Sequence, residues 1–216
     1  MHSRARGLGP IALGTLFLSL PAQALDPVLP SLARPLERAR AADPYVGKPK
    51  PPEEQSILKT KAEDKDVVHS VAYVHAPLPE VFTALKDPSV LVSRNKLLRS
   101  WSAERKPDET IRISHEVRKI ITVNFDQSWK LTVLEGTLTD PKAVLARGRK
   151  TAGTKYIRLL EDSILAMDVG DGVTRLEFVR HQNIVSAGGD EAEAYLRDVF
   201  LRLRAKVHGQ PLPPVR

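Results

Sequence analysis

The sequence predicts an α+β domain in which a curved antiparallel sheet wraps around a long C-terminal helix, with two short helices after the first strand. Three observations predict it. An opening strand runs into Ala76-Pro77 and a short helical segment, a series of segments with alternating apolar residues follows, and Gly188-Gly189 precedes a long amphipathic segment. Alternation places apolar side chains on one face of a strand, and helical spacing places them on one face of a helix. Sheet and helix are therefore expected to share an apolar interior.

The opening strand is expected over residues 66–75, because its residues alternate between two faces. Prolines at positions 77 and 79 end the strand, and apolar residues at helical spacing predict a short helix over residues 78–85. Asp87-Pro88 then combines an N-cap residue with a proline in the first helical turn. This pair predicts a second short helix that continues to about Ser93.

The region between residues 97 and 183 is expected to form a run of antiparallel strands. Ile111, Ile113, His115 and Val117 share one face of the strand expected over residues 110–119, and polar residues occupy the other. This pattern is typical of a half-buried antiparallel strand. The other strand segments, with a break at Asp126-Gln127, are 97–104, 121–125, 128–138, 144–150, 156–160, 164–169 and 173–183.

The last helix is expected to begin at Asp190, which forms a capping box with Glu193. Gly209 lies just beyond the expected end, and Pro211 prevents continuation. One apolar stripe runs along the helix, formed by Ala192, Tyr195, Leu196, Val199, Leu203 and Val207, and Phe200 widens it.

The first 24 residues have the pattern of an export signal. Arg4 and Arg6 are followed by an apolar stretch over residues 10–20, and Ala22-Gln23-Ala24 has small residues where a signal peptidase needs them. Cleavage after Ala24 would place the protein in the periplasm or outside the cell. The alternative is an uncleaved anchor, but the apolar stretch is shorter than the ~20 residues that cross a bilayer comfortably.

Residues 25–65 are expected to form a Pro-rich, charged linker that is mostly disordered. Seven prolines fall between Asp26 and Pro52, and residues 53–66 are mostly charged. Such a composition offers little apolar surface to bury. The folded domain is therefore expected over residues 66–208, followed by a tail over 209–216.

The composition excludes several functional classes. The chain has no cysteine, which excludes disulfides, thiol catalysis and thiolate metal sites. Its formal charge is +7, and loss of the two arginines before residue 25 would leave +5. Basic residues alternate with acidic ones and do not cluster as in nucleic-acid-binding proteins. A solvated surface explains this charge, and weak contact with anionic lipid head groups is the alternative.

Three segments of the chain resemble the START-like, Bet v 1-like superfamily, also called SRPBCC or polyketide cyclase/dehydrase-like proteins. The segments are residues 74–88, residues 156–178 and Ser186-Ala187-Gly188-Gly189 with the helix that follows. The resemblance implies a helix-grip fold, and many members enclose a cavity for lipids, sterols, quinones, polyketides or other apolar molecules. Some members are enzymes and others bind proteins. The chain has Ser163-Ile164 where a small residue and Trp are common in the family, so one aromatic wall is missing.

Two polar residues are candidates for orienting a ligand. His115 shares its strand face with Ile113 and Val117, where an imidazole could orient a ligand oxygen or act as general acid or base. The alternative is a core histidine that is bonded to backbone. Arg158 lies between Tyr156 and Leu160 on one face, where a guanidinium could hold a carboxylate or phosphate. Its alternative is an arginine that points outward from the sheet.

The remaining candidates are large apolar residues that could line a cavity or fill an ordinary core. The complete set of candidate ligand-binding residues is Trp101, Ile113, His115, Trp129, Tyr156, Arg158, Met167, Phe178, Tyr195 and Val199.

These patterns favour a non-catalytic protein that binds a small hydrophobic or amphipathic, lipid-like molecule in a cavity between sheet and helix. We expect no cofactor and no metal, because His69 and His75 are too far apart along one strand and no metal-binding motif occurs. One alternative is a cyclase or dehydratase that uses His115 and Arg158 on a bound carbonyl compound. Another is an interaction module of the cell envelope, for which the Pro-rich segment supplies reach. The sequence leaves the oligomeric state open.

Overall fold

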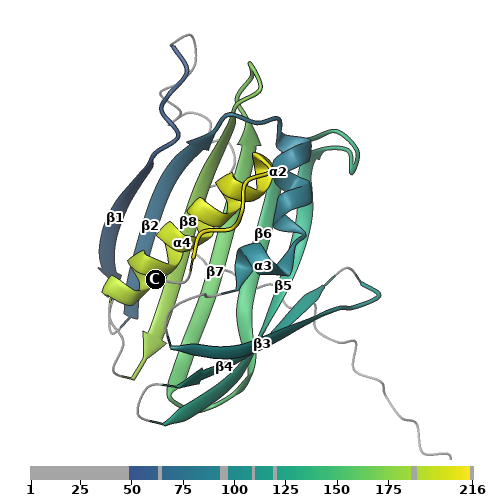
Figure 1. The fold of residues 1–216 in the computed structure, drawn as a ribbon. Coiled ribbons are helices and arrows are strands. Elements are labelled where there is room, and N and C mark those ends of the chain that lie inside the picture. Colours follow the sequence, from purple (N-terminus) through teal and green to yellow (C-terminus); the bar gives the residue numbers. More distant parts are fainter. Residues whose placement is uncertain are drawn as a thin grey trace, which may run out of the picture.

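In this computed structural model, residues 49–62, 65–92, 97–108, 110–118, 121–185 and 189–214 are described. They contain a single antiparallel sheet and three helices on one of its faces (Figure 1). The strands are β1 Gln55–Ala62, β2 Lys65–Val74, β3 Leu98–Arg105, β4 Ile111–Arg118, β5 Thr122–Gly136, β6 Pro141–Gly153, β7 Ile157–Asp168 and β8 Thr174–Ile184. The helices are α2 Leu78–Leu85, α3 Pro88–Leu91 and α4 Gly189–Val207.

The strand order is β1-β2-β8-β7-β6-β5-β4-β3. The pairing of β2 with β8 therefore joins the two N-terminal strands to the other six. The sheet bends around α4, and the β3–β4 hairpin crosses in front of the lower end of β5 (Figure 1). This arrangement is the helix-grip fold that the sequence predicts. None of the helices in the described ranges is both long and apolar enough to cross a membrane.

The linker prediction is wrong for residues 55–62, which form the edge strand β1. This strand pairs with β2 from Gln55↔Ala72 to Ala62↔Lys65. The Gln55 side chain also donates to Ser70 Oγ at 2.9 Å and to the carbonyl of Leu196 in α4 at 3.2 Å. Backbone pairing with β2 therefore orders a segment that has few apolar residues. The rest of the predicted linker before residue 49, and the predicted signal peptide, lie outside the described residues.

Two pairs of predicted strands are joined into single strands. The expected break at Asp126-Gln127 is a β-bulge within β5, which continues to Gly136. The gap expected at residues 161–163, between the predicted strands 156–160 and 164–169, is a regular part of β7. Polar residues interrupt the apolar pattern there without interrupting the backbone hydrogen bonds, because the Asp162 side chain has partners inside the fold.

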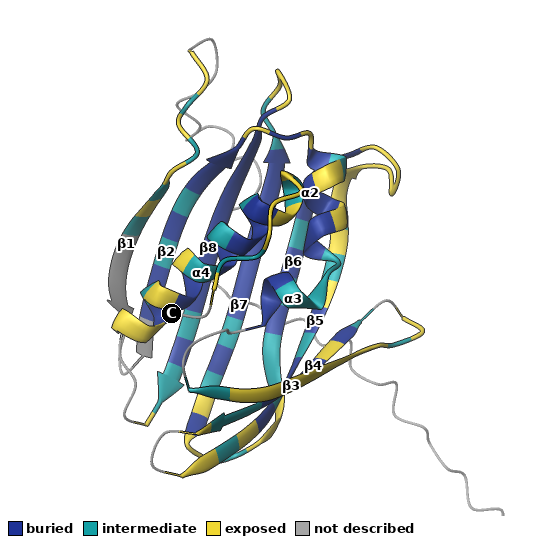
Figure 2. Ribbon diagram, viewed as in Figure 1, coloured by how far each residue is buried: buried dark blue, intermediate teal, exposed yellow. Residues whose placement is uncertain are grey.

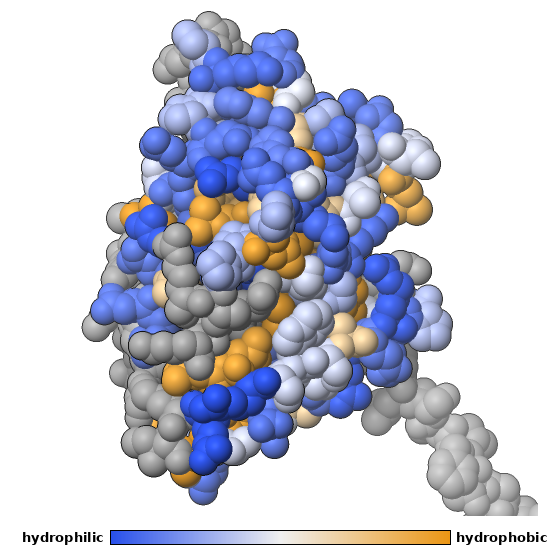
Figure 3. All heavy atoms as spheres, in the orientation of Figure 1, coloured by the Kyte–Doolittle hydropathy of each residue, from blue (hydrophilic) through white to orange (hydrophobic). Residues whose placement is uncertain are grey.

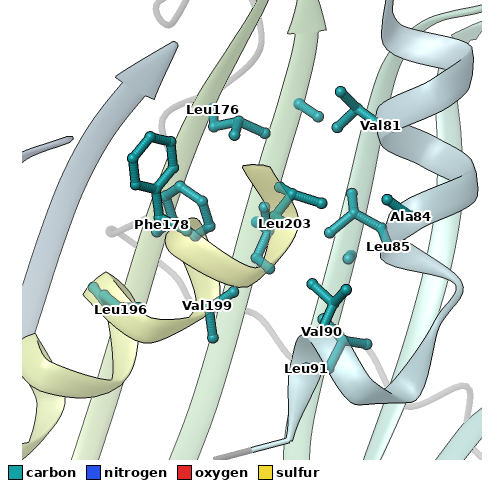
Figure 4. Close-up of a cluster of buried hydrophobic side chains, with 14 of the residues drawn as sticks. Val81, Ala84, Leu85, Val90, Leu91, Leu176, Phe178, Leu196, Val199 and Leu203 are labelled. Atoms are coloured by element: carbon teal, nitrogen blue, oxygen red, sulfur yellow. The ribbon is translucent and has the colours of Figure 1, made fainter. Parts of the chain in front are cut away.

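The three helices cover the concave face of the sheet and bury the main core there (Figure 2). Asp87 caps α3 by accepting from Ser89 N at 2.9 Å, as the sequence predicts. Arg202 of α4 donates to the carbonyl of Ser89 at 2.7 Å, which fixes α3 to the last helix. Figure 4 shows how side chains of α2, α3, α4 and β8 meet, among them Val81, Leu85, Val90, Leu176, Phe178, Val199 and Leu203.

Candidate functional site: a polar layer inside the grip

Buried polar side chains divide the concave face of the sheet into two apolar parts. The main core contains Ile113, Trp129, Ile164 and Phe178, and a smaller cluster near one end of the sheet contains Phe125, Ile157 and Leu160. Between them, at alternate positions of four strands, lies a polar layer formed by His115, Gln127, Asp162, Arg180 and Gln182.

Arg180 and Asp162 are the centre of the polar layer. Arg180 Nη1 lies 3.1 Å from Asp162 Oδ1, and both side chains are buried. Gln127 Nε2 donates to Asp162 Oδ2 at 2.5 Å, and Arg180 Nε donates to Gln182 Oε1 at 2.9 Å. The ion pair therefore has the additional hydrogen bonds that a buried pair requires to offset its desolvation.

Tyr195 connects this layer to the helices. Its ring lies 3.8 Å from the guanidinium carbon of Arg180, which is within cation–π range. Its hydroxyl donates to the carbonyl of Leu91 in α3 at 2.9 Å. Burial, and next the charge of Asp162, raise the pKa of Tyr195, so the phenol stays protonated and remains a hydrogen-bond donor.

Burial controls ionisation within the layer. Burial raises the pKa of Asp162, and the nearby Arg180 and the Gln127 hydrogen bond oppose that rise. Burial also lowers the pKa of His115 to about 4, and the positive charge of Arg180 contributes to the same shift. His115 is therefore a neutral imidazole at pH 7, with one nitrogen that donates and one that accepts a hydrogen bond.

Two rings beside the ion pair have polar atoms without a protein hydrogen bond of good geometry. His115 stacks on Phe125 with ring centroids 4.5 Å apart and an interplanar angle of 5°. The buried Nε1 of Trp129 has no hydrogen-bond partner among the residues that the structure describes, and neither ring nitrogen of His115 has a hydrogen bond of good geometry there. The backbone of Ile113 and Phe125 lies close enough to the imidazole to oppose part of the fall in its pKa. A buried polar atom without a partner costs about 1–3 kcal/mol, so both rings are suited to binding a polar group of another molecule.

The position of Trp129 depends on Gly148 in the neighbouring strand. Trp129 and Gly148 are directly paired between β5 and β6, and a Cβ atom at position 148 would lie 2.4 Å from Trp129 Cε2. The indole therefore occupies the space of the missing side chain. Trp129 lies in the main core, two residues along β5 from Gln127 of the polar layer.

The structure brings together seven of the ten predicted ligand-binding residues. Ile113, Trp129, Phe178, Tyr195 and Val199 lie in the main core, and His115 lies in the polar layer. Trp101 pairs with His115 across β3 and β4 but is 39% exposed, so it lies at the rim.

The other three predicted residues lie elsewhere. Tyr156 is exposed in the β6–β7 turn, and Arg158 is exposed at the start of β7. Met167 is buried with Ala143 and Leu165 in a separate cluster, because its neighbour Ala166 occupies the main core and adjacent strand residues point to opposite faces. The structure therefore does not bring these three into the candidate site.

Sequence reasoning missed Asp162, Arg180, Gln127 and Gln182. A signal for them exists, because each occupies an alternate position whose neighbours two residues away are mostly apolar. Recognising it requires the register of four strands, which no single segment reveals. No group of His, Asp and Glu suited to hold a metal ion occurs among the described residues.

Comparison with protein-family models gives no match, and comparison with curated proteins also gives none. Among solved structures, the chain is similar to a STAR-related lipid transfer protein from Xanthomonas axonopodis (12% identity, TM-score 0.48, covering 72% of this chain and 97% of that one). It is also similar to the lipid transfer and protein localization domain of human StarD13 (12% identity, TM-score 0.48, covering 73% and 85%). A third similar structure is the Zhui aromatase/cyclase from Streptomyces sp. R1128 (14% identity, TM-score 0.44, covering 67% and 92%).

Proposed function

We propose that the protein is exported and binds a small hydrophobic or amphipathic, lipid-like molecule between the concave face of the sheet and α4, without catalysing its conversion. The buried N–H of Trp129, which has no partner among the described residues, carries this proposal together with the imidazole of His115, whose nitrogens have no hydrogen bond of good geometry there. They adjoin apolar clusters on both sides, so a bound molecule would exchange water for apolar surface at ~25 cal/mol per Å². Its polar group would bind at the polar layer and set the orientation.

The charges of the layer favour an uncharged polar group on the ligand. The charge of Arg180 is already compensated by Asp162 at 3.1 Å, and the pKa of about 4 keeps His115 neutral at pH 7. A hydroxyl or carbonyl can use the donor and acceptor of a neutral imidazole and the N–H of Trp129. A carboxylate or phosphate would place an additional uncompensated charge in a buried site.

Native mass spectrometry of the protein purified from the periplasm of an expression host tests binding. We expect a bound apolar molecule, and we expect the uncharged fluorophore N-phenyl-1-naphthylamine to compete with it. The variant His115→Leu should bind the co-purified amphipathic molecule about five- to tenfold more weakly, because one hydrogen bond is lost. The variant His181→Leu removes an imidazole from the outward face of β8 and should bind normally. No bound molecule and no fluorophore binding would refute the proposal.

The same preparation tests the two remaining parts. The alternative function, a cyclase or dehydratase using His115, predicts that the recovered molecule changes mass during incubation with protein, whereas a binding protein returns it unchanged. Export with cleavage after Ala24 predicts that the purified chain begins at Leu25. N-terminal sequencing that finds Met1 on the periplasmic protein would contradict cleavage.

A further inference from the structure

Three exposed apolar side chains lie at the same end of the sheet, each beside or within a turn. Ile121 precedes β5 and is 47% exposed, Tyr156 precedes β7 and is 41% exposed, and Val185 follows β8 and is 46% exposed. Isolated exposed apolar residues are ordinary on a protein surface. Here, however, three of them lie on neighbouring turns at one end of the sheet.

Backbone hydrogen bonds connect the turns that carry these residues. Thr154 N donates to the carbonyl of Asn124 at 3.1 Å, and Val185 N donates to the carbonyl of Tyr156 at 2.8 Å. The ends of β4 and β8 and the start of β7 meet at the lower end of the molecule (Figure 1). The apolar side chains are therefore held at one end by the sheet itself.

Four exposed cations surround these turns: Arg99, Arg118, Lys155 and Arg158. The carbonyl of Leu97 accepts from Arg118 N at 2.8 Å, which brings the start of β3 to the same end. None of the four takes part in an ion pair among the described residues. The space-filling view shows strongly hydrophilic residues beside hydrophobic atoms at this end (Figure 3).

We propose that this end of the sheet, the turn face formed by Ile121, Tyr156, Val185 and the four cations, docks on an anionic lipid surface. Tyr156 combines an apolar ring with a polar hydroxyl, which suits the boundary between head groups and acyl chains. Ile121 and Val185 would enter the boundary between head groups and acyl chains, and the four cations would bind the anionic head groups.

Lipid is favoured over a protein partner by the shape of the turn face. A specific protein interface buries about 800 Å² per partner in a continuous, closely packed patch. Here the apolar side chains are separate and belong to different turns, with cations between them along the chain. Head groups can rearrange around separate side chains, whereas a rigid partner would need a matching pocket for each. This docking does not depend on the proposed ligand binding.

Co-sedimentation with vesicles tests the docking. The full chain and the chain beginning at Leu25 are each mixed with vesicles of phosphatidylcholine and with vesicles that also contain phosphatidylglycerol. We expect binding to the anionic vesicles that weakens as salt is added. Lys155→Gln with Arg158→Gln should weaken it by about 25-fold, since each cation near an anionic surface contributes about fivefold. Ile121→Asp with Tyr156→Asp should weaken it at least tenfold, because both residues leave the apolar boundary.

Matched controls lie away from the turn face. Leu138 is 74% exposed at the opposite end of β5, and Lys130 is exposed in its middle, so Leu138→Asp and Lys130→Gln should leave vesicle binding unchanged. Thermal unfolding checks that every variant is folded. The docking is refuted if the wild-type chain binds neither vesicle, which would leave a protein partner for this surface. Equal binding by the turn-face variants and the wild type would also refute it.

Discussion

Arg180 of β8 lies over the ring of Tyr195 in α4, with 3.8 Å between the guanidinium carbon and the ring centroid. The same guanidinium is paired with Asp162 of β7, and the hydroxyl of Tyr195 donates to the carbonyl of Leu91. One arginine therefore links two strands to the C-terminal helix, and the tyrosine extends this link to α3. Buried polar contacts therefore hold β7, β8, α4 and α3 together.

Removing the arginine alone should be severely destabilising. In Arg180→Leu the carboxylate of Asp162 remains buried without its cation, so we expect the free energy of unfolding to fall by about 3–5 kcal/mol. The double variant Arg180→Leu with Asp162→Asn removes both charges and keeps an acceptor for Gln127, so it should recover most of this loss. Urea denaturation monitored by circular dichroism measures both.

Tyr195→Phe provides the matched comparison. It retains the ring beneath Arg180 and removes only the hydroxyl that donates to Leu91, so we expect a smaller loss of about 1 kcal/mol. A loss below 1 kcal/mol for Arg180→Leu would show that the buried ion pair does not hold β7, β8 and α4 together.

The sequence predicts the apolar parts of this fold better than its polar parts. The alternation of Ile111, Ile113 and His115 correctly predicts a half-buried strand, because burial on one face leaves a period of two in any sequence. The sequence does not predict that Asp162 is buried, since a carboxylate within a strand normally faces water and its partners Gln127 and Arg180 are distant in sequence. Only the register of the sheet brings the three together.

The sequence also fails to predict the edge strand β1 and the side of the sheet on which Met167 lies. β1 has little apolar pattern because an edge strand can be stabilised largely by the hydrogen bonds of its single neighbour. Met167 is as apolar as a core residue, yet a position shifted by one along a strand points to the opposite face. Hydrophobicity alone therefore predicts that such a residue is buried but not on which side of the sheet.

Gly148 should be essential for the position of Trp129. A Cβ atom at residue 148 would lie 2.4 Å from Trp129 Cε2, so Gly148→Ala forces the indole out of its place. We expect a loss of about 1–3 kcal/mol from overpacking, together with a shift in tryptophan fluorescence. Chemical denaturation and emission spectra measure the two effects.

A second substitution tests whether the clash causes that loss. Trp129→Leu removes the ring, so adding Gly148→Ala to it should cost less than 1 kcal/mol. If Gly148→Ala is equally destabilising with and without the ring, the contact between the two residues is not the reason for the glycine.

His115 should make the protein less stable in mild acid. Burial and the charge of Arg180 lower its pKa to about 4 from the ordinary value of 6.5. Below pH 6.5 the unfolded chain binds a proton that the folded chain does not, so the stability present above that pH declines as the pH falls towards 4. Between pH 7 and pH 5 this contribution amounts to about 2 kcal/mol.

The variant His115→Leu should lose this part of the pH dependence, as measured by urea denaturation at pH 7, 6 and 5. His181→Leu, on the outward face of β8, should retain it. The comparison between variants is necessary because Asp162, with its raised pKa, acts in the opposite direction. If the His115→Leu profile is parallel to that of the wild type, the imidazole is not held neutral by burial.

Glu53 should fasten the segment before β1 to the end of α4. Its carboxylate accepts from His75 N at 2.6 Å and from His208 Nε2 at 2.9 Å, and its carbonyl accepts from Arg204 Nη1 at 3.1 Å. Burial tends to raise the pKa of Glu53, but the hydrogen bonds from His75 and His208 outweigh it and hold the pKa below its ordinary value. The stabilisation is therefore present at neutral pH and is lost as the pH falls through this lowered pKa.

Glu53→Gln removes the negative charge and keeps the size of the side chain, so we expect a loss of about 1 kcal/mol at pH 7. The loss should shrink as the pH falls through the lowered pKa of Glu53, because the wild-type carboxylate is then protonated as well. Hydrogen exchange should report the change locally, with faster exchange at His75 N and in β1. The neighbouring Glu54 is exposed and its side chain has no hydrogen bond among the described contacts, which makes Glu54→Gln the matched control. Equal exchange rates in Glu53→Gln and Glu54→Gln would mean that the Glu53 carboxylate does not help to hold β1 in place.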